Sequence, residues 1–220
     1  MGKRIVASLI LPPAAFGVLA VFVCLQWFAP VETAVYRWIS GFSGDGMTVF
    51  MRVITELGGA VPVIVFCLAL LLCKRTRLSV GLPISAAALI SVLCNQILKN
   101  LFQRPRPLVP RFSPADGFSF PSGHSMNNAA FYCMLFLLLL PLVARLWQKA
   151  LLAVGCILPP LLIGISRIYL GVHFFGDVLG GWLLGIWIAC VTYALWTRLC
   201  LPAIHRRWRA GDRENKKRRK

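Results

Sequence analysis

Three short blocks of the sequence carry residues that could bind and transform a phosphate group. The first is Lys99-Asn-Leu-Phe-Gln-Arg-Pro-Arg106-Pro107, the second is Pro121-Ser-Gly-His124, and the third joins Ser166-Arg167 to His173 and Asp177. Arginine forks match phosphate oxygens, and lysine adds a point charge. The second block is expected to open a helix, whose free N–H groups and positive dipole end attract phosphate. The candidate phosphate-binding residues are therefore Lys99, Arg106, Ser122, Gly123 and Arg167.

Two of the three histidines, His124 and His173, lie in these blocks. Two imidazoles at one phosphate site suggest a nucleophile and a general acid. Because Asp177 follows His173 by four residues, one helical turn would place both side chains on the same face. The carboxylate could then fix the imidazole tautomer and stabilise the imidazolium. This spacing favours His173 as the nucleophile and leaves His124 as the acid for the departing oxygen.

Each of these features also has a structural explanation when it is taken alone. An interfacial lysine or arginine commonly anchors lipid head groups, and a single histidine is usually structural. A serine before a helix often serves only as its N-cap. However, all three blocks are predicted to lie on one face of the molecule, which accidental placement does not explain. The joint pattern therefore favours a catalytic site.

Several other polar residues near these blocks are expected to play structural roles. Asn127 and Asn128 follow His124 by about one helical turn, and Asn95 precedes the first block. Glu56 lies near the end of a predicted membrane span, where a charge is costly unless it is paired. We therefore consider Glu56 a possible partner of a cation in the site.

Composition indicates that a membrane positions these blocks. Hydrophobic residues make up 58% of the chain and charged residues only 14%, against about 25% charged in an ordinary globular domain. A spanning helix needs roughly 20 predominantly apolar residues, and six stretches qualify. The sequence therefore predicts an all-α integral membrane bundle of six transmembrane helices. These stretches are approximately 5–28, 50–73, 78–98, 125–143, 146–165 and 178–199.

Basic residues in the short loops predict the orientation of the bundle in a cell membrane. They precede the first span, follow the second, flank the turn between the fourth and fifth, and fill the tail after the sixth. These four groups share one side, which should be the cytoplasm, so both termini are expected there. The extracellular or periplasmic side then holds the three blocks. Residues 1–204 would form the membrane domain, and residues 205–220 a basic tail contacting solvent or anionic lipid.

Charge and cysteine patterns disfavour other classes of protein. The net charge of +17 lies in clusters between apolar runs, which is typical of contact with anionic head groups rather than with nucleic acid. The eight cysteines form no C-x-x-C pair and show no zinc-ligand spacing, so neither a disulfide framework nor a zinc site is expected. The sequence also contains no cluster of carboxylates that would predict a site for another metal.

The three blocks resemble the signatures K-x6-R-P, P-S-G-H and S-R-x5-H-x3-D of the type 2 phosphatidic acid phosphatase superfamily. Members of that superfamily share a histidine-phosphatase site with vanadium haloperoxidases, and every fixed residue of the signatures is present here. The resemblance implies a helical bundle and a phosphohistidine mechanism without a metal or other cofactor. It also implies a nucleophile at His173 with its partner Asp177, a general acid at His124, and phosphate-binding roles for the five residues named above.

The expected substrate is a lipid phosphate or diphosphate, because a site at the membrane boundary can accept a head group while the tails stay in the bilayer. The resemblance implies undecaprenyl diphosphate, phosphatidylglycerophosphate, phosphatidate or lipid A, and we favour the first two. A lipid phosphotransferase stays open, since an alcohol could replace water in the second step. A transporter or silent lipid-binding protein is less favoured, because the histidines and Asp177 are intact and no internal repeat is visible. The oligomeric state stays open.

Overall fold

The structure, a computed structural model, describes residues 3–200 and the side chains from Leu9 onward. Within this range the chain is helical and contains no strand, which confirms the predicted all-α class. The predicted basic tail, 205–220, lies outside the described residues. The helices are α1 (Lys3–Cys24), α2 (Ala29–Ser40), α3 (Asp45–Leu57), α4 (Ala60–Leu72), η1 (Arg77–Gly81), α5 (Leu82–Phe102), α6 (Gly123–Leu139), η2 (Leu140–Leu142), α7 (Leu146–Tyr169), α8 (Phe175–Leu195) and η3 (Trp196–Cys200).

Five helical segments are long and apolar enough to cross a bilayer, and they correspond to the second to sixth predicted spans. They are Asp45–Leu72, Arg77–Phe102, Gly123–Leu142, Leu146–Tyr169 and Phe175–Cys200. The first predicted span corresponds to α1, which meets the same criteria only together with α2. A bend of 92° separates these two helices. The described residues thus contain five candidate spans by length and composition, or six when α1 and α2 are counted as one.

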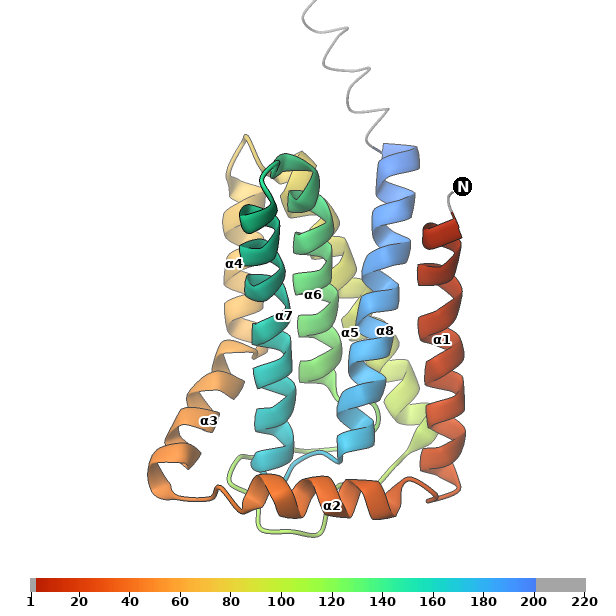
Figure 1. The fold of residues 1–220 in the computed structure, drawn as a ribbon, viewed down its shortest axis with the longest axis vertical. Helices are drawn as coiled ribbons and strands as arrows, with labels where there is room; N and C mark the ends of the chain where they lie inside the picture. Colours follow the sequence, from red (N-terminus) through yellow and green to blue (C-terminus); the bar gives the residue numbers. More distant parts are fainter. Residues whose placement is uncertain (1–2, 201–220) are drawn as a thin grey trace, which may run out of the picture.

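Helix α2 was not predicted, and it closes one end of the bundle. In Figure 1, α1 runs beside α8, and α2 lies across the lower end of the upright helices. The expected first span continued to Phe28, but α1 ends at Cys24 and the chain turns through Gln26, whose φ is 58°. Hydropathy alone does not locate such a turn, because apolar residues continue through it.

The two ends of the bundle differ in the elements that they carry. The start of α1, the α4–α5 turn and the α6–α7 turn lie at the upper end in Figure 1. The lower end holds α2, the loop between α5 and α6, the start of α8 and the end of α7. The basic turns therefore lie opposite the three polar blocks, as the sequence predicted.

Close packing of α6 on α8 brings two of these blocks together. A Cβ added at Gly181 would lie 2.7 Å from the carbonyl oxygen of Ser122 and 2.9 Å from the Cβ of Ser125. Small residues allow such close approach of membrane helices. At the start of both helices, the Ser122 N–H donates to the carbonyl oxygen of Asp177 at 2.9 Å. The second and third blocks are therefore joined through their backbones.

Candidate active site

Asp177 in the first turn of α8 lies against His173, which precedes the helix rather than sharing a helical turn with Asp177 as the sequence predicted. Asp177 is completely buried, and its Oδ2 accepts the Phe174 N–H at 2.9 Å, which helps to cap the helix. The same oxygen lies 3.3 Å from Nδ1 of His173, which is only 3% exposed. Because an ionised carboxylate can only accept, Nδ1 must carry the proton in this pair. The Nε2 atom of His173 is then the unprotonated nitrogen of the ring.

Arg106 places a cation beside that nitrogen. Its Nη1 donates to Nε2 of His173 at 3.3 Å and to the carbonyl oxygen of Val172 at 2.8 Å. Its Nε and Nη2 donate to the carbonyl oxygens of Gly117 (3.0 Å) and Asp116 (2.7 Å). These backbone contacts fix the guanidinium where an anion in contact with Nε2 would meet it.

The surroundings of His173 keep its imidazole neutral. Burial lowers the pKa of His173 to about 4, although the hydrogen bond and the charge of Asp177 act in the opposite direction. The ordinary pKa of a histidine is about 6.5. At neutral pH the ring therefore presents an unprotonated Nε2, as a nucleophile requires.

Arg167 lies in the last turn of α7 and is 5% exposed. Its Nη1 donates to Oγ1 of Thr55 on α3 at 2.8 Å, while its Nε is buried without a hydrogen-bond partner among the described residues. A buried guanidinium nitrogen without a partner is a donor available to an anion. Glu56, the partner proposed from the sequence, is exposed and forms no ion pair in the described part of the chain. Thr55 supplies the hydrogen bond from this turn, and Glu56 acts on Arg167 electrostatically without forming an ion pair.

The start of α6 presents the second block. Ser122 is the N-cap residue, and its Oγ accepts from the Oγ of Ser125 at 3.0 Å and, at 3.5 Å, from its N–H. Gly123 packs against Asn95, since an added Cβ would lie 3.0 Å from Asn95 Oδ1. Asn95 in turn donates from Nδ2 to the carbonyl oxygen of Pro121 at 3.0 Å. Asn95 therefore supports the helix start structurally, as expected.

The remaining predicted residues, His124 and Lys99, join the same cluster. His124 is half-buried and interacts electrostatically with Arg167, His173, Lys99 and Arg106. Lys99, in the last turn of α5, interacts in the same way with Asp177 and with both arginines. The structure therefore gathers all eight predicted residues at one end of the bundle, from α5, the following loop, α6, α7 and α8.

Sequence reasoning missed a buried ion pair behind Asp177. Glu32 on α2 is 4% exposed, and its carboxylate accepts hydrogen bonds from both terminal nitrogens of Arg104, at 3.0 and 2.6 Å. Arg104 also donates from Nη1 to Oδ1 of Asp177 at 2.6 Å. Arg104 lies within the first block of the sequence but is not one of the fixed residues of the K-x6-R-P signature. The one available signal for Glu32 was an acidic residue close to an apolar span.

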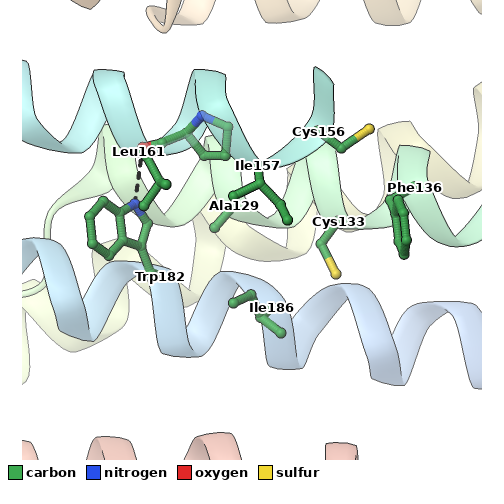
Figure 2. A pocket seen from close by; sticks show the side chains of 9 residues that line it. Ala129, Cys133, Phe136, Cys156, Ile157, Leu161, Trp182 and Ile186 are labelled. Atoms are coloured by element: carbon green, nitrogen blue, oxygen red, sulfur yellow. Dashed lines mark hydrogen bonds between the residues drawn. The ribbon is translucent and has the colours of Figure 1, made fainter. Parts of the chain in front are cut away.

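An apolar cavity that opens to the surface of the bundle lies between α6, α7 and α8. It has a volume of about 260 Å³, and Figure 2 shows residues from all three helices around it. At one place in its wall, Nε1 of Trp182 donates to the carbonyl oxygen of Pro160 at 3.1 Å, drawn as a dashed line. Its lining side chains carry no residue of the three blocks, so the cavity is separate from the polar cluster.

The described residues offer no ligand set for a metal ion. Between residues 3 and 200, no group of three or more histidine, cysteine, aspartate or glutamate side chains could hold one. The two buried acidic residues, Glu32 and Asp177, instead contact Arg104 and His173.

Comparison with known proteins gives consistent matches. The profile of the PAP2 superfamily matches residues 80–199, which is more than half of the chain and includes all three blocks. Phosphatidylglycerophosphatase B of Bacillus subtilis is 43% identical over 97 residues, covering 43% of this chain and 47% of that protein. An undecaprenyl-diphosphatase of Sulfolobus acidocaldarius is 32% identical over 129 residues, covering 54% and 56%. The chain thus spans about half the length of these curated relatives.

A solved structure matches over a larger part of the fold. It is the crystal structure of a transmembrane PAP2-type phosphatidylglycerolphosphate phosphatase from Bacillus subtilis. The TM-score is 0.78 at 27% identity, and the match covers 89% of this chain and 98% of that one. The bundle described here therefore resembles a known transmembrane architecture nearly from end to end.

Proposed function

The chain belongs to the PAP2 superfamily, and on this premise we propose that it hydrolyses a lipid phosphate or diphosphate through a phosphohistidine intermediate. The observation that carries the proposal is the array Arg106–His173–Asp177, in which a buried, neutral imidazole has its Nδ1 on a carboxylate and its Nε2 beside a guanidinium. This arrangement suits attack on an anionic phosphorus centre.

The reaction would take two steps. In the first, Nε2 of His173 attacks the terminal phosphorus in line with the bond to the departing oxygen, which belongs to the lipid alcohol of a monophosphate or to the lipid monophosphate of a diphosphate. The N–P bond forms as the P–O bond breaks, and His124 gives its proton to the departing oxygen. In the second, a water molecule attacks phosphorus and gives a proton to His124. The N–P bond breaks, which releases phosphate and restores the imidazole. Asp177 would keep the Nδ1 proton in place throughout.

The cations would stabilise charge on the nonbridging phosphate oxygens. Lys99, Arg106 and Arg167 are proposed to contact these oxygens, together with the backbone N–H groups at Ser122 and Gly123. The unpartnered Nε of Arg167 supports this role, since its burial is costly unless a ligand accepts its hydrogen bond. The fixed guanidinium of Arg106 supports it as well.

We propose undecaprenyl diphosphate or phosphatidylglycerophosphate as the substrate. Two relatives are named for these activities. The polar cluster lies at one end of helices that are apolar enough to span a bilayer. A lipid could therefore keep its tails among lipid chains while its phosphate reaches His173.

We further propose that both termini face the cytoplasm and that the site faces the extracellular or periplasmic side. The α4–α5 and α6–α7 turns support this, because they carry Lys74, Arg75 and Arg145 at the end opposite the site. Residues 1–204 would be the membrane domain and 205–220 a cytoplasmic tail. A reporter fused to the C-terminus that works only inside the cell should be active, and an inactive one would reverse this orientation.

Phosphate release from purified protein in detergent and EDTA tests the proposed function. The assay would use both lipids, with and without an acceptor alcohol, and would compare wild type with His173→Ala. His205→Ala is the matched control, since His205 is the third histidine of the chain and lies in the basic tail. Release by wild type and His205→Ala, but not by His173→Ala, is expected. Full activity in His173→Ala would refute the assignment of the nucleophile, and transfer to the alcohol without phosphate release would indicate a phosphotransferase.

A further inference from the structure

The carboxylate of Asp177 is bound on both of its oxygens. Oδ2 faces His173 and the Phe174 N–H, while Oδ1 accepts from Arg104 at 2.6 Å. The hydrogen bond to Arg104 is the shorter of the two side-chain contacts. The orientation of the carboxylate toward the imidazole therefore depends on a residue that lies on the side away from His173.

Arg104 is itself fixed by Glu32. The two terminal nitrogens of Arg104 form a bidentate pair with the two carboxylate oxygens of Glu32. Oε1 of Glu32 also accepts the N–H of Gly176, in the first turn of α8, at 3.1 Å. Glu32 thus links α2, the loop and the helix that carries Asp177.

Arg104 differs from Arg106 and Arg167 in its partners, because only Arg104 among the three forms ion pairs with carboxylates in the described part of the chain. Both terminal nitrogens of Arg104 already have carboxylate partners, and the guanidinium carbon lies 4.1 Å from the centre of the Phe174 ring. Burial lowers the pKa of Arg104, but Glu32 and Asp177 more than offset this, so the pKa is raised. Arg104 therefore stays charged and engaged, with no free fork for a phosphate group.

We propose that Arg104, anchored by Glu32, is a positioning residue that holds Asp177 in the orientation required by the His173 nucleophile. This inference rests on the proposed phosphatase function. Without Arg104, Oδ1 of Asp177 would lose its partner, and two buried carboxylates would face each other without a cation between them. The carboxylate would then orient His173 less well, while the phosphate-binding groups would stay in place.

The first test separates positioning from phosphate binding. We expect Arg104→Ala to lower kcat about 10- to 100-fold, as loss of residues that orient a reactive group typically does. The KM for the lipid and the inhibition constant for inorganic phosphate should stay near wild type. Arg111→Gln is the matched control, because Arg111 is an exposed arginine of the same loop whose one hydrogen bond goes to a backbone carbonyl. A higher KM and weaker phosphate inhibition in Arg104→Ala, with kcat retained, would overturn the inference.

A cavity beside the ion pair allows a second test by chemical rescue. Glu32 and Arg104 line this cavity of about 370 Å³, together with Phe120 and Phe174. Added guanidinium ion should occupy the place of the deleted side chain and restore part of the kcat of Arg104→Ala. It should not do so in Arg104→Ala/Glu32→Gln, where the anchoring carboxylate is lost. Equal stimulation of both variants, or of neither, would contradict the role of Glu32 as the anchor.

The third test asks whether Arg104 acts through Asp177. In an Asp177→Asn background, Arg104→Ala should cause no further loss of kcat, because the group that it positions is already changed. A full additional loss would show that Arg104 acts elsewhere. An inactive wild type would instead disprove the proposed phosphatase function itself, which separates the two failures.

Discussion

Charged groups in front of Asp177, toward His173, are paired differently from those behind it. In front, Arg167 keeps a buried Nε without a partner among the described residues, and Arg106 donates to backbone carbonyl oxygens and the imidazole but to no carboxylate there. Behind, Arg104 has two carboxylate partners, one of them bidentate. A cation without a carboxylate partner suits a group that must receive an anionic ligand, whereas a cation paired with carboxylates suits a group that holds others in place. The two regions thus use the same side chain for different purposes.

The largest effect should follow from a change at the boundary between the two regions. Asp177→Asn removes the charge opposite the Nδ1 proton and allows the wrong imidazole tautomer, so we expect kcat to fall about 10⁴-fold. The measurement is single-turnover phosphate release by protein that shows the wild-type melting temperature in detergent. Activity near wild type would mean that Asp177 serves only as the cap of α8.

A substitution in the front region should lower kcat less than Asp177→Asn does, and it should also weaken phosphate binding. We expect Arg167→Gln to lower kcat about 10²- to 10³-fold, as loss of one donor to developing negative charge commonly does. It should also raise the inhibition constant for inorganic phosphate, in contrast to Arg104→Ala. Arg167→Lys would test whether charge alone suffices. Unchanged phosphate inhibition in both variants would place Arg167 outside the phosphate site.

A methyl group behind Asp177 should have a milder effect. A Cβ at Gly176 would lie 2.6 Å from Oε1 of Glu32, so Gly176→Ala should displace the anchor of Arg104 without removing any charge. We expect kcat to fall about tenfold, with KM unchanged. Gly155→Ala is the matched control, since a Cβ at that position in α7 meets no atom within 4 Å. If both variants keep full activity, the position of Glu32 is not critical.

The front region could be predicted from the sequence, and the region behind it could not. His124, His173 and Asp177 are reactive residue types at short spacings, and helix starts and turns bring them together by local geometry. Glu32 lies on another helix and has no local spacing relation to Arg104 or Asp177. Its position depends on the 92° bend between α1 and α2, which continuous hydropathy conceals.

Polar contacts also explain why the second span begins earlier than predicted. Hydropathy placed its start near Phe50, but the helix begins at Asp45. Thr48 shares a hydrogen bond of 2.9 Å with the hydroxyl of Tyr169, and Arg52 donates to the carbonyl oxygen of Phe112 at 2.8 Å. Asp45 and Thr48 thus belong to a helical turn that precedes Phe50, at the end of the bundle that carries the site. A window that counts apolar residues leaves such a turn out.

The pH dependence of activity should give the smallest effect and would test the environment of the nucleophile. Because the pKa of His173 is lowered to about 4, the imidazole stays neutral as the pH falls from 7 toward 5, so the nucleophile is not lost over this range. Arg106 contributes to that lowering, so Arg106→Gln should move the acidic limb of kcat/KM to higher pH. Titration of the substrate is common to both enzymes, and the difference between their profiles therefore reports on the two imidazoles that Arg106 faces, His173 and His124. A wild-type limb near 6.5 that Arg106→Gln leaves in place would instead indicate a solvated histidine. The difference between the region in front of Asp177 and the region behind it would then no longer explain how the nucleophile is kept neutral.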